Sequence, residues 1–347
     1  MRDPERPVFV FTRHPDFDLE WPFVAERLTA GLGELGTVRV AEVPGGEPLH
    51  QRVDLQAAVG LALFGGRLTE AGLAAAPHLL AVGCNTDNTG DGLPLDALWQ
   101  REIPVIDTTR AWGASVAECA LGLALGALRR IPQWHGRLAA GEPLWDFRYQ
   151  QFCDDPGFAN GELGARRVGV LGLGQIGGRI ARVCAALGSD VVAHDPFAAE
   201  ERFRAAGARP ADLETLVAHS EVLFVAVPPT PSARGLLSAE RIGRLRRGTL
   251  VVVVTRAHAV DMAALRRRIL ADELAGAFDV YDVEPLPPDD PLRGRDNVVH
   301  TPHIAGRTRD ANLRTADLII EDFGRVLRGL PAQHGLTREA IRARTAR

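Results

Sequence analysis

The sequence predicts an α/β fold built from two doubly wound domains, each a parallel sheet covered by helices. Short β-branched and apolar runs alternate with segments of helical periodicity along most of the chain. One strand leads directly into a glycine-rich turn, Gly172 to Gly177, and then into a helix. The chain has 347 residues, of which 46% are hydrophobic. This length suffices for two domains of roughly 150 residues each.

The composition excludes several classes of protein. The formal charge of −4 is mixed in sign along the chain, so neither nucleic acid nor an anionic membrane is indicated as a partner. All 40 basic residues are arginine, which excludes a Schiff-base or Walker lysine mechanism. The four cysteines form no Cys-x-x-Cys pair, so we expect neither a metal site nor a disulfide framework. No apolar run suggests a membrane span or a signal peptide, and we expect a cytoplasmic location.

The first domain begins with a strand at 8–11 and a helix over 21–32 that Gly33 and Gly36 should end. Further strands are predicted at 38–40, 58–64, 79–82 and 105–106, with a short helix near 69–76. Small and polar residues from Gly83 to Asn88 follow the strand at 79–82. Because open α/β sheets bind ligands at the carboxyl ends of their strands, this loop is a candidate ligand site. A polar turn with a purely structural role would have the same sequence pattern.

The glycine-rich turn indicates a dinucleotide site. Gly172 allows the tight turn, Gly174 lets the backbone approach a pyrophosphate, and Gly177 lets helix and strand pack closely. Unpaired N–H groups at the helix start would hold the phosphate charge. A second strand, 191–193, ends on Asp195, whose carboxylate would accept hydrogen bonds from the adenosine ribose and repel a 2′-phosphate. These features predict NAD rather than NADP.

The segment between the two domains predicts a subunit contact. A helix over 115–130, with Ser115 and Glu118 in a capping-box pattern, is apolar nearly all round. We expect it between the domains or at a subunit interface. Residues 131–164 look loop-rich and contain six aromatic side chains: Trp134, Trp145, Phe147, Tyr149, Phe152 and Phe158. Since a second subunit could cover them, we expect a dimer.

The rest of the second domain has predicted strands at 222–227, 250–254, 276–280 and 298–300. Helices should begin at Ser238 and cover 262–271, and a last amphipathic helix over 310–330 should return to the first domain. The carboxyl ends of the strands fall on one sheet edge, where a cofactor would lie. They are Asp195, Pro228, Thr255 with Arg256, Asp279 and His303.

Three residues on that edge suit hydride transfer at an alcohol carbon. His303 can act as base for the hydroxyl proton and, in reverse, as acid for the ketone oxygen. Glu284 beside it would fix the tautomer and stabilise the imidazolium. Arg256 can grip a substrate carboxylate and polarise the adjoining carbonyl. Taken singly, Arg256 could equally be a surface charge, Glu284 a turn residue, and His303 a hydrogen-bond donor in a loop.

At these residues the chain resembles the D-isomer-specific 2-hydroxyacid dehydrogenase family, whose members include glyoxylate/hydroxypyruvate reductases and phosphoglycerate dehydrogenases. The resemblance rests on the turn VGVLGLGQIG, on Thr255-Arg256 and on the two most specific motifs, DVYDVEPLP around Glu284 and TPHIAG around His303. It implies a Rossmann NAD-binding domain, 113–305, inserted in a flavodoxin-like substrate domain, 1–112, to which 306–347 returns. It also implies NAD as cofactor, a small 2-hydroxy or 2-keto acid as substrate, and a homodimer.

The resemblance further implies sets of contact residues. The catalytic residues would be Arg256, Glu284 and His303. The residues that bind the cofactor would be Gly172, Gly174, Gln175, Ile176, Gly177, Asp195, Val227, Pro228, Val254, Thr255, Arg256, Asp279 and His303. Those that bind the substrate would be Val82, Gly83, Cys84 and Arg256.

The chain departs from the family pattern at Val253, Ala257 and Asn85, where asparagine, glycine and glycine are usual, and residues 146–160 look long. These departures concern the substrate, and we expect unusual recognition at Asn85, Arg110, Trp112, Trp145 and Arg148. Extra arginine would suit a phosphorylated acid. Alternatives are a phosphonate- or phosphite-type dehydrogenase and a non-catalytic, NAD-sensing protein of the corepressor type. A formate dehydrogenase is disfavoured because it carries glutamine where this chain has Glu284.

Overall fold

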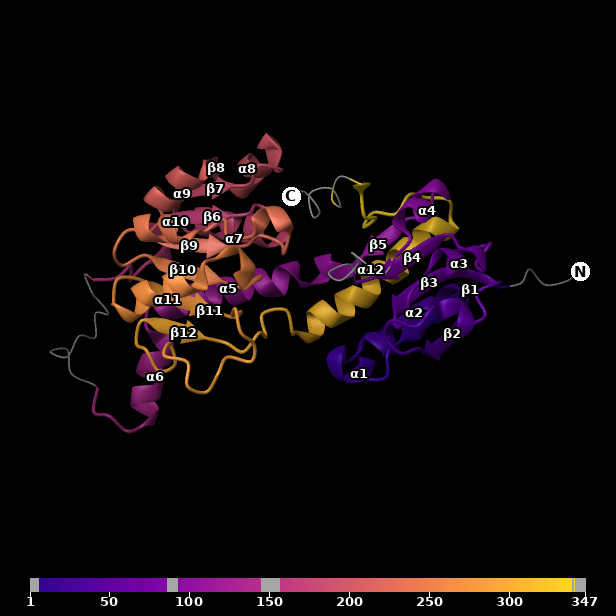
Figure 1. Ribbon diagram of the computed structural model, residues 1–347, viewed down its shortest axis with the longest axis horizontal. Coiled ribbons are helices and arrows are strands. Elements are labelled where there is room, and N and C mark those ends of the chain that lie inside the picture. The colour runs from indigo at the N-terminus through magenta and orange to yellow at the C-terminus, as the bar shows by residue number, and fades with distance from the viewer. Residues whose placement is uncertain (1–5, 86–92, 145–156, 339, 341–347) are drawn as a thin grey trace, which may run out of the picture. The chain divides into compact units, whose positions relative to one another are not determined.

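The computed structural model describes residues 6–85, 93–144, 157–338 and 340. The chain divides into two compact units (Figure 1). The first unit is formed by Met1–Trp112 and Arg307–Ile341, and the body of the second unit is Gly113–Gly306. The sequence placed the corresponding boundaries after residues 112 and 305.

The first unit contains a five-stranded parallel sheet in the order β2-β1-β3-β4-β5. Its strands are β1 (Val8–Arg13), β2 (Thr37–Glu42), β3 (Ala58–Phe64), β4 (Ala81–Cys84) and β5 (Val105–Asp107). Its helices are α1 (Phe17–Glu20), α2 (Val24–Leu35), α3 (Glu70–Ala74), α4 (Leu95–Gln100) and α12 (Arg309–Leu327). This strand order is that of a flavodoxin-like sheet, as predicted.

Helix α12 forms one wall of the core of the first unit. Its Phe323 stacks on Phe9 of β1 with ring centroids 5.8 Å apart. Its Ile319 lies so close to β4 that a Cβ on Gly83 would come within 2.6 Å of its side chain. The last long helix of the chain therefore completes the core of the first sheet.

Two boundaries in the first unit differ from the prediction. Helix α2 continues through Gly33 to Leu35 and ends at Gly36, because a helix packed by Val24, Leu28 and Leu32 tolerates one glycine. Strand β4 ends at Cys84 instead of residue 82. The small residues after Val82 continue the strand because they pair with β3 and β5 on either side.

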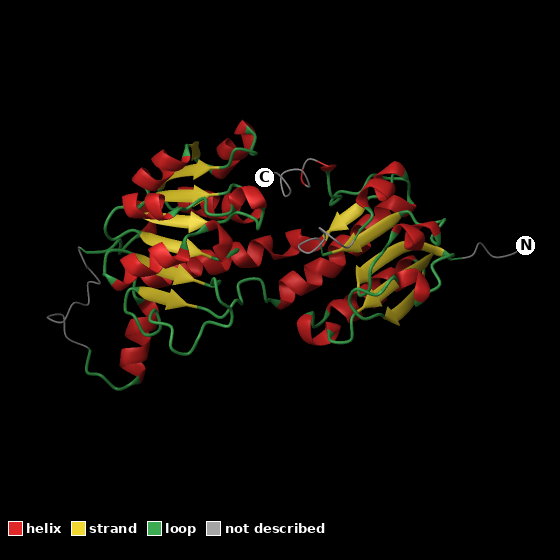
Figure 2. Cartoon of the chain, viewed as in Figure 1, coloured by secondary structure: helices red, strands yellow, loops and turns green. Residues whose placement is uncertain are grey.

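The second unit contains a seven-stranded parallel sheet in the order β12-β11-β10-β9-β6-β7-β8. In each of the two sheets the strand arrows point the same way (Figure 2). The strands of the second sheet are β6 (Arg167–Leu171), β7 (Asp190–His194), β8 (Arg209–Pro210), β9 (Val222–Val225), β10 (Leu250–Val253), β11 (Ala275–Phe278) and β12 (Val298–His300). The order reverses between β6 and β9, which is the switch point of a Rossmann fold.

Helices cover this sheet on both faces, as the doubly wound prediction required. They are α5 (Gly113–Leu128), α6 (Ile131–Ala139), α7 (Gln175–Ala186), α8 (Glu200–Ala206), α9 (Leu213–His219), α10 (Ala239–Arg244) and α11 (Met262–Leu270). Ser238 caps α10 by accepting a hydrogen bond from the Arg241 N–H. Helices α6, α8 and α9, of nine, seven and seven residues, are absent from the prediction.

Helix α5 corrects two expectations. It begins at Gly113, directly after a 3₁₀ turn over Thr108–Trp112, so Ser115 lies buried inside the helix and does not cap it. The segment Thr108–Leu128 is long and apolar enough to cross a membrane, whereas the sequence analysis predicted no membrane span. In the structure, 56% of its most apolar stretch is buried. Helix α5 packs on α7, β10, β11 and β12, so its apolar character is that of a core helix.

The region expected to be loop-rich begins with helix α6, which contains Trp134. The aromatic side chains Trp145, Phe147, Tyr149 and Phe152, and Arg148, lie outside the described residues. The proposed cover of these aromatics by a second subunit therefore stays a prediction.

Candidate active site

The predicted strand, glycine turn and helix are all present at the end of β6. Gly172 has a φ of +90°, a backbone conformation that a side chain would strain. A Cβ on Gly177 would lie 1.9 Å from the Gly172 carbonyl oxygen, so helix and turn touch directly. A Cβ on Gly174 would meet nothing within 4 Å, so the space in front of the turn is open.

Helix α7 begins at Gln175 with no side-chain cap on its first turn. Its first backbone N–H groups therefore face the open space beside Gly174, the arrangement that binds a phosphate at a helix start. The residues present fit the pyrophosphate of a dinucleotide. Gln175 and Ile176 lie in this first turn, as predicted.

Asp195 lies just beyond β7 and holds the glycine turn. Its Oδ2 accepts a hydrogen bond from the Leu173 N–H at 2.8 Å, and its Oδ1 accepts one from the Phe197 N–H at 3.0 Å. A carboxylate has further lone pairs that remain able to accept from ribose hydroxyls. Asp195 therefore holds the turn in shape and can also accept hydrogen bonds from a ligand.

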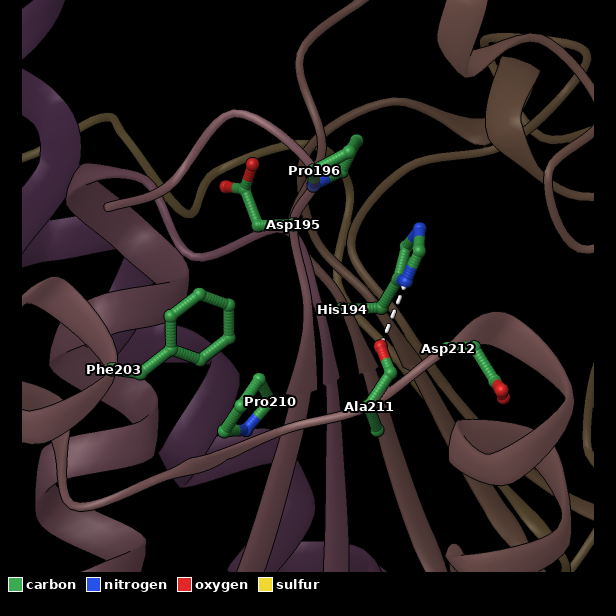
Figure 3. Close-up of a pocket in the computed structure, with 7 residues that line it drawn as sticks. All are labelled: His194, Asp195, Pro196, Phe203, Pro210, Ala211 and Asp212. Carbon is green, nitrogen blue, oxygen red and sulfur yellow. Dashed lines mark hydrogen bonds between the residues drawn. The ribbon is translucent and has the colours of Figure 1, made fainter. Parts of the chain in front are cut away.

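A pocket of about 370 Å³ lies beside this acid (Figure 3). It is lined by His194, Asp195, Pro196, Phe203, Pro210, Ala211 and Asp212. In the close-up, His194 bonds to the Ala211 carbonyl, with 2.9 Å between Nδ1 and the oxygen. The pocket combines an aromatic ring, two prolines, a histidine and two acids, which suits the adenosine end of a dinucleotide.

At the other end of the same sheet edge, Glu284 and His303 form a pair. Glu284 Oε2 lies 2.7 Å from His303 Nδ1, and both side chains are partly exposed. Since a carboxylate only accepts, we assign the hydrogen to Nδ1, which leaves Nε2 to exchange a proton with a ligand. The second oxygen, Oε1, accepts from the Tyr281 N–H at 2.8 Å, so the carboxylate is held at both ends.

His303 lies in a turn with left-handed backbone, with a φ of +54°. Such a conformation is uncommon for a residue with a side chain and needs support from its surroundings. Asp279 provides that support: Oδ1 accepts from the Thr301 hydroxyl and the Ile304 N–H, and Oδ2 accepts from the Ala305 N–H. The Asp279 carbonyl also accepts from the His303 N–H at 2.9 Å.

Arg256 follows β10, whose neighbour β11 leads to Glu284 and whose next neighbour β12 leads to His303. The three predicted catalytic residues thus follow three adjacent parallel strands. The Arg256 guanidinium bonds to the Thr255 carbonyl at 2.8 Å, and the Thr255 hydroxyl donates to the Val227 carbonyl at 3.0 Å. The structure brings Glu284 and His303 into contact, and Arg256 makes a local hydrogen bond, to Thr255.

These positions can be compared with known proteins. A family model described as the D-isomer specific 2-hydroxyacid dehydrogenase, NAD binding domain, matches residues 121–305. The chain belongs to this family. Residues 121–305 contain the glycine turn, Asp195, Arg256, Glu284 and His303, so the family match covers the whole site described above.

Relatives of the chain include two archaeal proteins named D-3-phosphoglycerate dehydrogenase. The one from Archaeoglobus fulgidus is 37% identical over 72% of this chain and 46% of its own length. The one from Methanocaldococcus jannaschii is 30% identical over 87% of this chain and 56% of its own length. The chain therefore spans about half the length of these relatives.

Solved structures of similar fold cover nearly the whole chain. A phosphoglycerate oxidoreductase from Rhizobium etli has a TM-score of 0.82 and 26% identity, covering 95% of this chain and 98% of its own. A D-isomer specific 2-hydroxyacid dehydrogenase from Xanthobacter autotrophicus Py2, in complex with NADPH and MES, has a TM-score of 0.68 and 27% identity over 96% of this chain and 98% of its own. The predicted family and fold class are both confirmed.

Two groups of predicted contacts lie in buried surroundings, and their predicted roles stay predictions. Asp279 was expected at the cofactor, but its carboxylate is fully buried and its hydrogen bonds go to the turn of His303. Val82, Gly83 and Cys84 were expected in a substrate loop, but they lie inside β4, buried between β3 and β5. Their backbone groups belong to the sheet, so a ligand would meet the chain from Asn85 onward.

The remaining predicted contacts lie near the sheet edge. Val227 and Val254 are buried, and Pro228 is exposed. The departures Val253 and Ala257 are buried beside Arg256. Among the described residues, no group of three or more His, Cys, Asp and Glu side chains could hold a metal ion. Sequence reasoning missed Tyr281, whose N–H fixes Glu284; its place inside the DVYDVEP motif was the signal available.

Proposed function

We propose that this protein is an NAD-dependent oxidoreductase that transfers a hydride between nicotinamide and C2 of a small D-2-hydroxy acid or its 2-keto partner. The contact of 2.7 Å between Glu284 and His303 carries this proposal. It lies on the same edge of the same sheet as the glycine turn after β6. An acid–base pair and a nucleotide site on one edge suit oxidation of an alcohol.

The three side chains have separate roles in this reaction. His303 Nε2 accepts the hydroxyl proton when the alcohol is oxidised and returns it when the ketone is reduced. Glu284 holds the Nδ1 hydrogen and stabilises the imidazolium that forms. Arg256 binds the substrate carboxylate through its planar fork and polarises the carbonyl beside it. Nicotinamide, when bound, supplies or accepts the hydride.

We assign the cofactor to the glycine turn, the first turn of α7 and the pocket at Asp195. The proposed contacts are Gly172, Gly174, Gln175, Ile176, Gly177 and Asp195, with Pro228, Thr255 and Arg256 toward the nicotinamide. The negative charge of Asp195 favours NAD, because a 2′-phosphate would be repelled there. The similar Xanthobacter protein is described with NADPH, so this preference is a property to be measured on this chain.

The family and the relatives support the proposed substrate class. A small hydroxy acid fits a site with one arginine and one acid–base histidine. Several relatives are named D-3-phosphoglycerate dehydrogenase, and the arginine-rich composition suits a phosphorylated acid. We therefore propose a 2-hydroxy acid that carries a phosphate as the first candidate, with glyoxylate and hydroxypyruvate next. We also propose a cytoplasmic homodimer.

The test is a steady-state assay of NADH and NADPH oxidation with a panel of 2-keto acids, with and without a phosphate group, and of NAD reduction with the matching hydroxy acids and phosphite. Turnover of at least one 2-keto acid, abolished by His303→Ala, supports the proposal. Turnover of phosphite alone would indicate the phosphonate-type alternative. NADH binding without turnover of any compound would indicate a binding protein and overturn the proposal.

A further inference from the structure

A second pair of side chains lies behind Glu284 and His303. Tyr281 and His300 come three residues before Glu284 and His303 in their respective segments. The Tyr281 hydroxyl lies 3.1 Å from His300 Nδ1, and the two rings stack with centroids 6.0 Å apart. Besides the hydrogen bonds of Asp279, two side-chain contacts thus join the segments that carry the catalytic pair: Glu284 with His303, and Tyr281 with His300.

The partners of His300 determine its tautomer. Nε2 lies 3.0 Å from the Leu292 carbonyl, which only accepts, so Nε2 carries a hydrogen. Burial lowers the pKa of His300, so the ring is neutral near pH 7 and Nδ1 accepts from the Tyr281 hydroxyl. Burial likewise raises the pKa of Tyr281 to about 12, so the phenol keeps its proton. The contact is therefore one between two neutral groups, in which His300 Nδ1 shares the single hydroxyl hydrogen of Tyr281 with two neighbouring carbonyls.

Tyr281 is anchored on every side. Its ring contacts Phe278, with centroids 6.3 Å apart, and the hydroxyl also lies 3.2 Å from the Phe278 and Thr301 carbonyls. Only 8% of the residue is exposed. Because the side chain is fixed, the backbone N–H that donates to Glu284 Oε1 at 2.8 Å is fixed with it.

We propose that Tyr281 and His300 are positioning residues, which set the distance between Glu284 and His303 by joining the two segments behind them. This inference rests on the proposed function for its catalytic readout. Tyr281 acts on the carboxylate through its own backbone N–H. His300 acts on the turn through Thr301 and Pro302, the two residues that separate it from His303. Neither side chain takes part in proton transfer itself.

The test compares Tyr281→Phe and His300→Ala with a variant that loses a buried hydrogen bond elsewhere in the same sheet. In Thr249→Val the Thr249 hydroxyl loses its bond of 3.1 Å to the Ser220 carbonyl, near the amino end of β10. We expect Tyr281→Phe and His300→Ala to lower kcat by about 3- to 10-fold, the equivalent of one hydrogen bond, with KM for NADH unchanged. Thr249→Val should lower stability and leave kcat unchanged.

Two further variants separate positioning from loss of stability. The double variant should be no slower than the slower single variant, because both changes break the same contact. His300→Asn, whose Oδ1 can replace Nδ1 as acceptor, should recover most of kcat. If Tyr281→Phe and His300→Ala keep kcat as Thr249→Val does, or if His300→Asn is as slow as His300→Ala, the proposal is overturned.

Hydrogen exchange tests the same contact without any substrate. The backbone amides of residues 281–284 should exchange faster in Tyr281→Phe than in the wild type and in Thr249→Val. This readout holds even if no acid is turned over, so failure of the proposed function and failure of the positioning role are distinguishable. Equal exchange in all three proteins would overturn the positioning role.

Discussion

The two ends of the second sheet edge present different kinds of groups to a ligand. Around β6 and β7, hereafter the nucleotide half, the site is made of backbone: Gly172 and Gly177 shape the turn, and Asp195 accepts hydrogen bonds from backbone N–H groups. Around β10, β11 and β12, hereafter the catalytic half, the site is made of side chains. Arg256, Glu284 and His303 come from three separate segments.

Because the two halves are built differently, different substitutions should inactivate them. A backbone site fails when an added Cβ collides with a neighbouring carbonyl, and it then loses both stability and cofactor affinity. A side-chain site fails when one functional group is removed, and it then loses rate while the fold and the cofactor site stay intact. The following variants test whether these two modes of failure are separate.

The largest effect should come from His303→Ala. We expect kcat to fall by roughly 10²- to 10⁴-fold, since the proton-transfer group is lost, with the dissociation constant of NADH little changed. Steady-state kinetics and fluorescence titration of NADH measure the two quantities. His219→Ala is the control, because His219 Nε2 bonds to the Asp190 carbonyl and lies 3.7 Å from the Asp190 carboxylate, at the amino end of β7. A wild-type rate in His303→Ala would contradict the catalytic assignment.

Arg256→Gln should have the next largest effect. Loss of charge-assisted contacts to a carboxylate costs about 1.5–3 kcal/mol, so kcat/KM for the acid should fall by roughly 10- to 150-fold. The KM for NADH should change little if the two halves are separate. Arg246→Gln is the matched control, because Arg246 is exposed and donates to the Ala218 carbonyl away from the site. Equal losses for acid and NADH would show that Arg256 serves both halves.

The sequence predicted the nucleotide half more completely than the catalytic half, for a physical reason. Gly172, Gly174, Gly177 and Asp195 lie in one strand–turn–helix–strand unit, so spacing along the chain fixes their arrangement in space. Glu284 and His303 meet across nineteen positions. Their contact depends on the pairing of β11 with β12, which spacing alone does not specify.

Two features that the sequence did not foresee have the same origin. Asp279 is next to the ligand edge in sequence, but its carboxylate turns inward because the left-handed turn of His303 offers it three donors. The strand at β4 continues to Cys84 because both neighbouring strands extend to it. In each case tertiary contacts, and not local propensity, decide where a side chain points or where a strand ends.

Gly177→Ala should damage the nucleotide half alone. The new Cβ would lie 1.9 Å from the Gly172 carbonyl oxygen, and such overpacking typically lowers the free energy of unfolding by about 1–3 kcal/mol. NADH binding should weaken, with kcat at saturating NADH nearly unchanged. Gly178→Ala is the control next to it, because its Cβ would meet its nearest neighbour, the Leu173 carbonyl oxygen, at 3.6 Å. That variant should be as stable as the wild type or more so.

Asp195 tests whether charge or turn geometry governs cofactor choice. Asp195→Ala removes the acceptors for the Leu173 and Phe197 N–H groups, so NADH should bind about 10-fold more weakly. Asp195→Asn removes the charge and keeps one acceptor oxygen, so it should gain affinity for NADPH and lose less affinity for NADH. If both variants lose the same affinity for NADH, the loss comes from the negative charge that both remove, and the hydrogen bonds to the turn contribute nothing to binding.

The smallest effect concerns one thiol in each half. Burial raises the pKa of Cys184, on α7, from 9.0 to about 12 and that of Cys119, on α5, from 9.0 to about 11. Because the folded protein favours the neutral thiol, the stability that each contributes is full below about pH 9 and is lost as pH rises through its folded pKa. Urea unfolding of the wild type between about pH 8 and about pH 11 should therefore show falling stability, and Cys184→Ala should show a shallower fall. Cys119→Ala should flatten the curve less, because Cys119 is less buried and the Thr301 side chain partly offsets the burial of its thiol. If Cys119→Ala instead flattens the curve more than Cys184→Ala, the Cys119 thiol is shielded from water more completely than the Cys184 thiol.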